Sequence, residues 1–171
     1  MDLDLNVDIE AQEYRSAEKR LTLTLPTAKV LKVQRIQNAT QWLNYNAKRE
    51  TVLHEGGQEV TEVFHGTRST SPDKIAMSPV GFDPKLGTSV VGVVWFASDA
   101  HYSACGYSYV NSTLSQDHHQ TCEQLLLCNI LRNAKPPRAP STDVGQPGQI
   151  HEIREACRCL PTHIISYVWN R

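Results

Sequence analysis

The apolar stretches of this chain are short, and proline, glycine and polar residues separate them. The most continuous stretch is residues 123–131, EQLLLCNIL, which is typical of a strand buried on both faces. Residues 59–64 and 89–97 are rich in β-branched and aromatic side chains. Residues 30–36 and 163–169 are also expected to be strands. The pattern predicts a mainly β domain with a few short helices.

The clearest helix signal is Asn38, because asparagine is a preferred residue at helix N-termini. We expect a helix over residues 39–50 after this cap. The pattern predicts that this helix presents Trp42, Leu43 and Tyr45 to a core.

Two further helix starts are expected to be brief. Ser71 followed by Pro72 predicts one of them, since proline fits the first helical position. Ser98 is expected to cap a helix that runs through Cys105. Residues 134–148 are rich in Pro, Gly and Ser, and this composition predicts a loop.

The N-terminal residues alternate between polar and apolar side chains. The apolar members are Leu3, Leu5, Val7 and Ile9. This two-residue period suits an edge strand or a docked tail. At 171 residues the chain is long enough for a single core. We therefore expect one domain over residues 26–171, preceded by an N-terminal extension over residues 1–25.

The composition is that of an ordinary globular protein. Hydrophobic residues make up 40% of the chain, charged residues make up 20%, and the formal net charge is −1. This balance gives no electrostatic preference for nucleic acid. No window is long and apolar enough for a membrane span, and no basic stretch followed by an apolar run opens the chain. We expect an intracellular protein, cytoplasmic or nuclear, with no membrane partner.

The cysteines give two readings. They are Cys105, Cys122, Cys128, Cys157 and Cys159. An odd, sparse set fits free thiols in a reducing compartment. Alternatively, Cys122 with the nearby His118 and His119, and with Cys105 or Cys128, offers the ligand types of a tetrahedral zinc site. The lack of a Cys-x-x-Cys pair favours thiols, so we expect no metal.

Several common catalytic signatures are absent from the sequence. It contains no Gly-x-Gly-x-x-Gly and no phosphate-binding loop ending in Gly-Lys-Ser/Thr. It also contains no Gly-x-Ser-x-Gly and no His-Glu-x-x-His. Rossmann, P-loop, α/β-hydrolase and zinc-protease chemistries are therefore not indicated.

Six segments resemble, in the same order, the mono-ADP-ribosylating branch of the poly(ADP-ribose) polymerase superfamily. They are KVQRIQNATQWLNY (32–45), EVFHGTR (62–68), GFDP (81–84), WFASDAHYSACGYS (95–108), EQLLLCNIL (123–131) and CLPTHIISY (159–167). Each segment alone is a weak signal, but the ordered set is specific. The resemblance implies an α+β ADP-ribosyltransferase fold: two packed antiparallel β-sheets, a cleft between them, and short flanking helices.

The resemblance also implies roles for individual residues. His65 matches the histidine that hydrogen-bonds the ribose next to nicotinamide in NAD⁺. Gly66 matches the glycine whose backbone holds the carboxamide, where a side chain would block the approach. Thr67 follows in the same segment and is expected to contribute to binding. Ser103 matches a serine whose hydroxyl contacts the carboxamide.

Tyr107 matches the tyrosine that stacks on the nicotinamide ring. Because spacing varies here within the family, Tyr102 and Tyr109 remain alternatives for this role. The loop after Asp83 and the loop at residues 131–148 are shorter than the family's usual ones. Val93 stands where the family has Gly.

Two departures from the family's His-Tyr-Glu triad concern catalysis. Trp95 takes the tyrosine position, where its indole can line a pocket but cannot accept a hydrogen bond. Ile150 takes the position of the catalytic glutamate, whose carboxylate stabilises the positive charge that develops on the ribose. Glu152, two residues on, is a displaced substitute or a solvent-facing carboxylate.

The resemblance therefore implies an NAD⁺-dependent mono-ADP-ribosyltransferase that releases nicotinamide and does not elongate polymers. The implied acceptor is a protein side chain or a nucleic-acid end. Loss of both the tyrosine and the glutamate favours an alternative, a catalytically inactive module that binds NAD⁺, another ligand or a protein.

Overall fold

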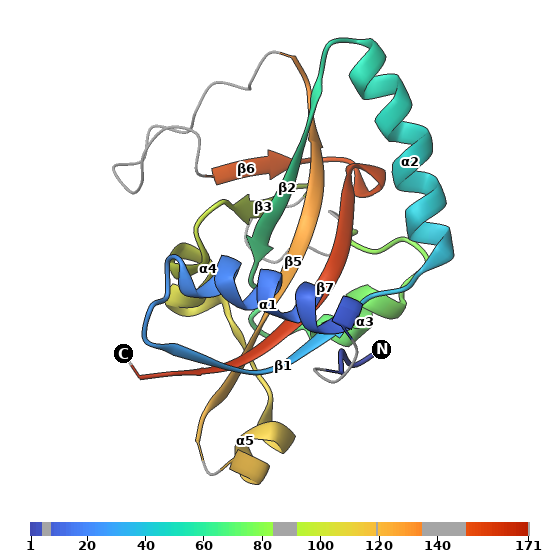
Figure 1. Cartoon of the computed structure of the whole chain (residues 1–171). Coiled ribbons are helices and arrows are strands. Elements are labelled where there is room, and N and C mark those ends of the chain that lie inside the picture. The colour runs from blue at the N-terminus through green and yellow to red at the C-terminus, as the bar shows by residue number, and fades with distance from the viewer. Residues whose placement is uncertain (5–7, 84–91, 119, 135–149, 171) are drawn as a thin grey trace.

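The fold is α+β, as predicted. The computed structural model describes residues 1–4, 8–83, 92–118, 120–134 and 150–170. The helices labelled in Figure 1 are α1 (Asp8–Thr22), α2 (Ala39–His54), α3 (Pro72–Met77), α4 (Ala100–Tyr107) and α5 (Ser112–His118). A 3₁₀ turn spans Ala156–Arg158. The strands are β1 (Ala28–Arg35), β2 (Gln58–His65), β3 (Val94–Ala97), β4 (Tyr109–Val110), β5 (Cys122–Arg132), β6 (Ile150–Ile153) and β7 (Cys159–Trp169).

All described strands belong to one antiparallel sheet with β5 at its centre. The order is β1-β7-β5-β2-β3-β6, and β4 pairs with one end of β5. Nine of the eleven residues of β5 are buried, as expected for a strand covered on both faces. The predicted strand at residues 123–131 is thereby confirmed. Within the predicted strand at 89–97, residues 89–91 lie outside the described residues, and β3 begins at Val94.

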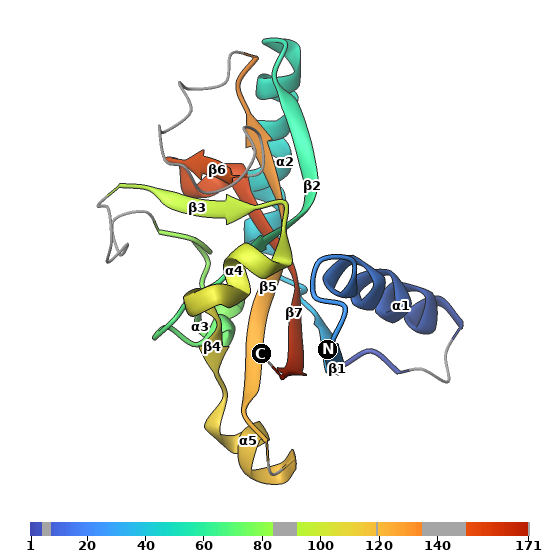
Figure 2. The same cartoon turned by 90° about the vertical axis from the view of Figure 1, so that its left-hand side faces the viewer.

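The sheet bends sharply between β2 and β3, which share only the residue pair Phe64–Ala97. Figure 2 shows β3 running across the direction of β2 and β5. Val94, Phe96 and Ile153 from the short strands pack with Leu126 and other side chains of the long strands in one apolar cluster. The expectation of two packed sheets was therefore wrong: the described strands are connected as one sheet, which bends so that β3 and β6 run across the long strands.

A second apolar cluster contains side chains of α1 and α4. Leu21, Phe64, Ala104 and Tyr167 belong to it. Figure 2 shows α1 on the opposite side of β5 and β7 from β3. The end of β2 therefore lies where the two clusters meet, since Phe64 belongs to one and its neighbour Val63 to the other.

The N-terminal alternation predicted an edge strand or a docked tail: the first residues dock on β1, but the chain from Asp8 onward forms α1 instead of a strand. Leu5 and Val7 lie outside the described residues, and Ile9 is 74% exposed. The buried residues of α1 are Ala11, Ala17 and Leu21, a helical spacing that the two-residue pattern concealed. Strand-like pairing at this end is limited to one bridge between Asp2 and Gln34 within the described residues.

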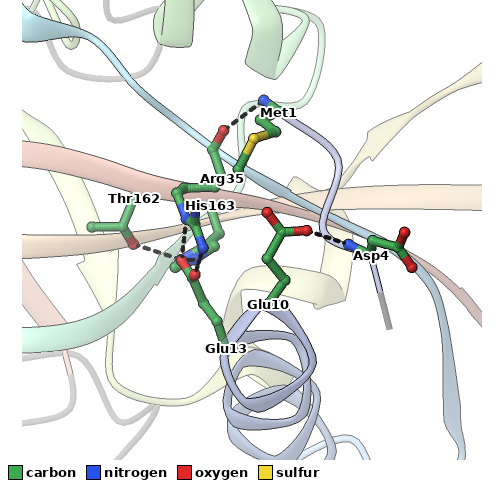
Figure 3. Close-up of polar contacts among 7 residues, drawn as sticks. All are labelled: Met1, Asp4, Glu10, Glu13, Arg35, Thr162 and His163. Atoms are coloured by element: carbon green, nitrogen blue, oxygen red, sulfur yellow. Dashed lines mark hydrogen bonds and ion pairs between the residues drawn. The ribbon is translucent and has the colours of Figure 1, made fainter. Parts of the chain in front are cut away.

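Polar contacts fix α1 to the sheet (Figure 3). Glu13 makes two hydrogen bonds to the guanidinium of Arg35 on β1. Its carboxylate also lies 2.6 Å from Nε2 of His163 on β7. The amino group of Met1 donates to the Arg35 carbonyl at 2.9 Å. One carboxylate of α1 therefore joins two neighbouring strands.

The predicted cap of α2 is confirmed. Asn38 Oδ1 accepts a hydrogen bond from the Gln41 amide at 3.1 Å. Tyr45 is buried as expected, but Trp42 and Leu43 are 56% and 61% exposed. The helix buries positions 41, 45 and 52, a stripe that leaves 42 and 43 on its outer side.

The starts of α3 and α4 are close to those predicted. Ser71 precedes α3 with Pro72 in its first turn, but the serine side chain makes no capping hydrogen bond. Asp99, rather than Ser98, caps α4, because its carboxylate accepts from the His101 amide at 2.7 Å. No helix among the described residues is long and apolar enough to cross a membrane.

Candidate active site at the end of strand β2

His65 ends β2, and its ring lies among aromatic side chains. Nδ1 is 2.7 Å from the carbonyl oxygen of Trp95. The Phe82 and Phe96 rings lie at centroid distances of 5.0 and 5.3 Å. Although part of the residue reaches solvent, burial of the ring lowers the pKa of His65 to about 4. At neutral pH the ring is uncharged. Because a carbonyl only accepts, Nδ1 carries the proton and Nε2 is left as an acceptor.

Gly66 packs directly against the end of α4. A Cβ added to Gly66 would lie 2.6 Å from the carbonyl carbon of Tyr107, so no side chain fits here without moving backbone. Two residues on, the Arg68 amide donates to the Tyr107 carbonyl at 2.8 Å, and Arg68 Nε donates to the Gly106 carbonyl at 2.7 Å. The segment after β2 and the end of α4 therefore form one unit.

Thr67 lies between these contacts, and its hydroxyl is unsatisfied. Its Oγ1 is buried and has no hydrogen-bond partner within the described residues. A buried hydroxyl without a partner is costly, and this one lies directly after Gly66.

Tyr107, the last residue of α4, is 37% exposed. The Arg68 guanidinium lies 4.6 Å from the centroid of its ring. The Tyr102 ring is stacked on it at 5.8 Å with an interplanar angle of 23°. The structure thus brings two of the three tyrosine candidates together, while Tyr109 lies on β4. A planar ligand that stacks on Tyr107 has to compete with Arg68 or Tyr102 for a ring face.

Ser103 lies on the adjoining face of α4. Its side chain is buried, and Oγ donates to the Phe64 carbonyl at 3.3 Å. The hydroxyl therefore contacts the backbone immediately before His65. Within the described residues no hydrogen bond joins Ser103 to His65 itself.

Trp95 and Ile150 lie on one face of the β3–β6 pair. Their register places Trp95 opposite Glu152 and Ala97 opposite Ile150, and cross-strand neighbours share a face. The Glu152 carboxylate on this face is ion-paired with Arg154. The opposite face carries Phe96, which contacts His65. Trp95 thus meets His65 through its backbone carbonyl, while its side chain and Ile150 point to the other side of the strand pair.

His151 is a residue that the sequence analysis did not single out. It is buried on β6, and its Nε2 lies 3.0 Å from the Ser98 hydroxyl. Burial, with a smaller effect from Arg132, lowers its pKa to about 4. Its Nδ1 is buried without a partner within the described residues. The only signal in the sequence is its place between Ile150 and Glu152, which puts it on the inner face of an alternating strand.

The proposed zinc ligands are only partly described. His119 lies outside the described residues, Cys122 and Cys128 are buried, and Cys105 is exposed. Among the described residues there is no group of three or more His, Cys, Asp or Glu that could hold a metal ion.

No protein-family model matches the chain. The chain is 30% identical over 182 residues to a probable poly(ADP-ribose) polymerase of Dictyostelium discoideum, an alignment that covers 95% of this chain and 52% of that protein. It is also 30% identical over 184 residues to the protein mono-ADP-ribosyltransferase PARP12 of Homo sapiens, with coverage of 95% and 25%. The protein mono-ADP-ribosyltransferase PARP14 of Homo sapiens is 32% identical over 98 residues, which cover 54% of this chain and 5% of that protein.

The chain therefore spans about half the length of the Dictyostelium relative and a quarter of the human PARP12 protein. Two of these alignments extend over nearly all of the chain, and the relatives bear the names of the family that the six ordered segments resemble. On this evidence the chain belongs to the poly(ADP-ribose) polymerase superfamily, in its mono-ADP-ribosyltransferase branch.

Proposed function

We propose that the chain is an NAD⁺-dependent mono-ADP-ribosyltransferase. It transfers single ADP-ribose units to a protein side chain or a nucleic-acid end and releases nicotinamide. The observation that carries the proposal is the state of His65, a neutral imidazole fixed through Nδ1 to the Trp95 carbonyl. Its Nε2 is an acceptor suited to a ribose hydroxyl, next to the glycine and threonine that follow.

The described residues fit a nicotinamide riboside in several respects. The unsatisfied Thr67 hydroxyl offers a hydrogen bond beside Gly66. Tyr107 offers an aromatic face, although Arg68 or Tyr102 has to give way to a stacked ring. Packing within the protein also requires glycine at position 66, because Tyr107 occupies the space that a side chain would fill.

The chemistry explains the restriction to single additions. The bond between nicotinamide and ribose breaks, nicotinamide leaves with the bonding electrons, and positive charge develops on the ribose carbon. The acceptor nucleophile then bonds to this carbon. A hydroxyl acceptor passes its proton to solvent, whereas an ionised carboxylate acceptor has no proton to lose. In the family a carboxylate at the position that matches Ile150 stabilises that charge, whereas the Ile150 side chain is apolar and offers none. The charge has to be met by the acceptor's own carboxylate or by Glu152, which is already paired with Arg154.

The test is incubation with labelled NAD⁺ followed by autoradiography and mass spectrometry. The wild-type chain is expected to add single ADP-ribose units. We expect His65→Ala to lose on the order of a hundredfold in labelling, since it removes a group that positions the ribose. His54→Ala, an exposed histidine at the end of α2, is the matched control and should label normally. Equal labelling of wild type and His65→Ala would contradict the proposal.

The second candidate is a catalytically inactive binding module. The side chains of Trp95 and Ile150 favour it, because neither can perform the chemistry of tyrosine and glutamate. Wild-type protein that binds the nicotinamide mimic benzamide but acquires no label from NAD⁺ would establish this second function instead.

A further inference from the structure

Residues 98–100 form the turn from β3 into α4 and so connect Trp95 to Ser103. Hydrogen bonds from the C-terminal end of α1 and the residues just after it stabilise this turn. Arg20 Nη2 donates to the Ser98 carbonyl at 2.6 Å. The Ala100 amide donates to Thr24 Oγ1 at 3.0 Å. Both partners lie at the end of α1 or just after it. The last turn of α1 therefore fixes the connection between two elements of the candidate active site.

The same guanidinium also holds β2. Arg20 Nε donates to the Glu62 carbonyl at 3.1 Å. The Arg20 guanidinium carbon lies 5.2 Å from the centroid of the Phe64 ring. The side chain of Arg20 is only 19% exposed. Arg20 thus contacts Glu62 and Phe64, two residues of β2 that closely precede His65.

Arg20 makes these contacts at the junction of β2 and β3, where the two strands are paired at a single position. The pair Phe64–Ala97 is the one residue pair between β2 and β3. The guanidinium of Arg20 bonds to backbone on each side of this pair, at Glu62 on β2 and at Ser98 just after β3. Glu62 has a positive φ of 56°, and the register between β2 and β5 shifts between Val60 and Val63. The backbone of β2 is therefore irregular at the residue whose carbonyl Arg20 binds.

The geometry points to Arg20 as a positioning residue for the nicotinamide site, an inference that rests on the function proposed above. Arg20 acts through Phe64, Ser98 and the Phe64–Ala97 pair rather than by touching the ligand. By fixing β2 relative to the turn at residues 98–100, it sets His65 and Gly66 against Ser103 and Tyr107. Arginine suits this role because its planar fork donates to two carbonyls in fixed directions, which the single ammonium of lysine cannot copy.

The test compares Arg20→Lys with two controls. Arg15→Lys makes the same change at an exposed position of α1. Glu62→Gln removes the carboxylate that lies 3.8 Å from Arg20 Nε but keeps the backbone carbonyl. Benzamide affinity is measured by calorimetry, and hydrogen exchange of the Ala100 amide reports the geometry of the turn.

We expect Arg20→Lys to weaken benzamide binding by about tenfold and to speed exchange at Ala100, with little change in the β1–β7 amides. Both controls should behave as wild type. Unchanged affinity or unchanged Ala100 exchange in Arg20→Lys would overturn the positioning role, as would an equal loss in Glu62→Gln. Wild-type protein that binds no benzamide would instead overturn the proposed function, and this role with it.

Discussion

The surroundings of His65, and not only its residue type, determine the protonation state of its ring. An exposed histidine changes charge near pH 6.5, whereas burial lowers the pKa of His65 to about 4. The Trp95 carbonyl opposes this shift, but burial is the larger effect. The residue can therefore act as a hydrogen-bond acceptor throughout the neutral range.

The shifted histidines predict how stability depends on pH. In the unfolded chain, His65 and His151 take up protons as the pH falls below about 6.5, whereas the folded chain resists until about 4. Lowering the pH through this window therefore favours unfolding, by about 1 kcal/mol per imidazole between pH 7 and 5.5. Urea unfolding at both pH values measures the loss.

A His151→Gln variant should lose less stability across this pH window than the wild type, since one of the two imidazoles is removed. His54→Ala should follow the wild-type curve. A free energy of unfolding that stays constant from pH 7 to 5.5 would contradict the burial of both rings.

At the scale of elements, α2 is joined to α3 by its cap. Besides capping α2, Asn38 donates from Nδ2 to the Ala76 and Ser78 carbonyls, each at 3.0 Å. We predict that Asn38→Ala lowers the free energy of unfolding by about 1–2 kcal/mol. Asn46→Ala is the matched control and should be nearly neutral, because among the described residues the Asn46 side chain bonds only the Trp42 carbonyl. Equal midpoints for the two variants in thermal unfolding would refute the prediction.

Elements with a strong local signal could be predicted from the sequence. The strand β5 was found because its apolar run is continuous in the sequence, and the cap of α2 because Asn38 bonds the amide of Gln41, three residues on. The helix α1 was missed, since its buried residues are few and its exposed Ile9 completed a false alternation.

The site could be predicted only in part. His65, Gly66, Ser103 and Tyr107 were inferred from a family resemblance, and their roles remain predictions. No local pattern indicates that Arg20 reaches Ser98, because 78 residues separate them in the sequence. The lowered pKa of His65 also depends on Phe82 and Phe96, which the fold brings together from distant segments.

At the scale of the whole molecule, Glu13 ties α1 to the sheet. Its hydrogen bond to Arg35, together with His163, lowers the pKa of Glu13 to about 2. The lowered pKa contributes stability that is fully present above about pH 4.5 and is lost as the pH falls toward 2. We expect Glu13→Gln to be destabilised by on the order of 1–3 kcal/mol at pH 7 and to show a shallower acid transition.

Glu10→Gln provides the comparison, since the half-buried Glu10 bonds only the Asp4 amide through its carboxylate among the described residues. Circular dichroism between pH 5 and 2 follows both variants. Identical acid transitions for Glu13→Gln and wild type would show that α1 is not held through this carboxylate.

If the segment after β2 binds a nicotinamide carboxamide, as we propose, benzamide should raise the thermal midpoint of unfolding as its concentration increases. A ligand at a hundred times its Kd stabilises the folded state by about 2.7 kcal/mol, a rise of about 5–10 °C for a chain of this size. The account predicts such a rise for wild type and none for Gly66→Ala, whose added Cβ would collide with Tyr107. A wild-type midpoint that does not move with benzamide, or an equal rise in both proteins, would contradict it.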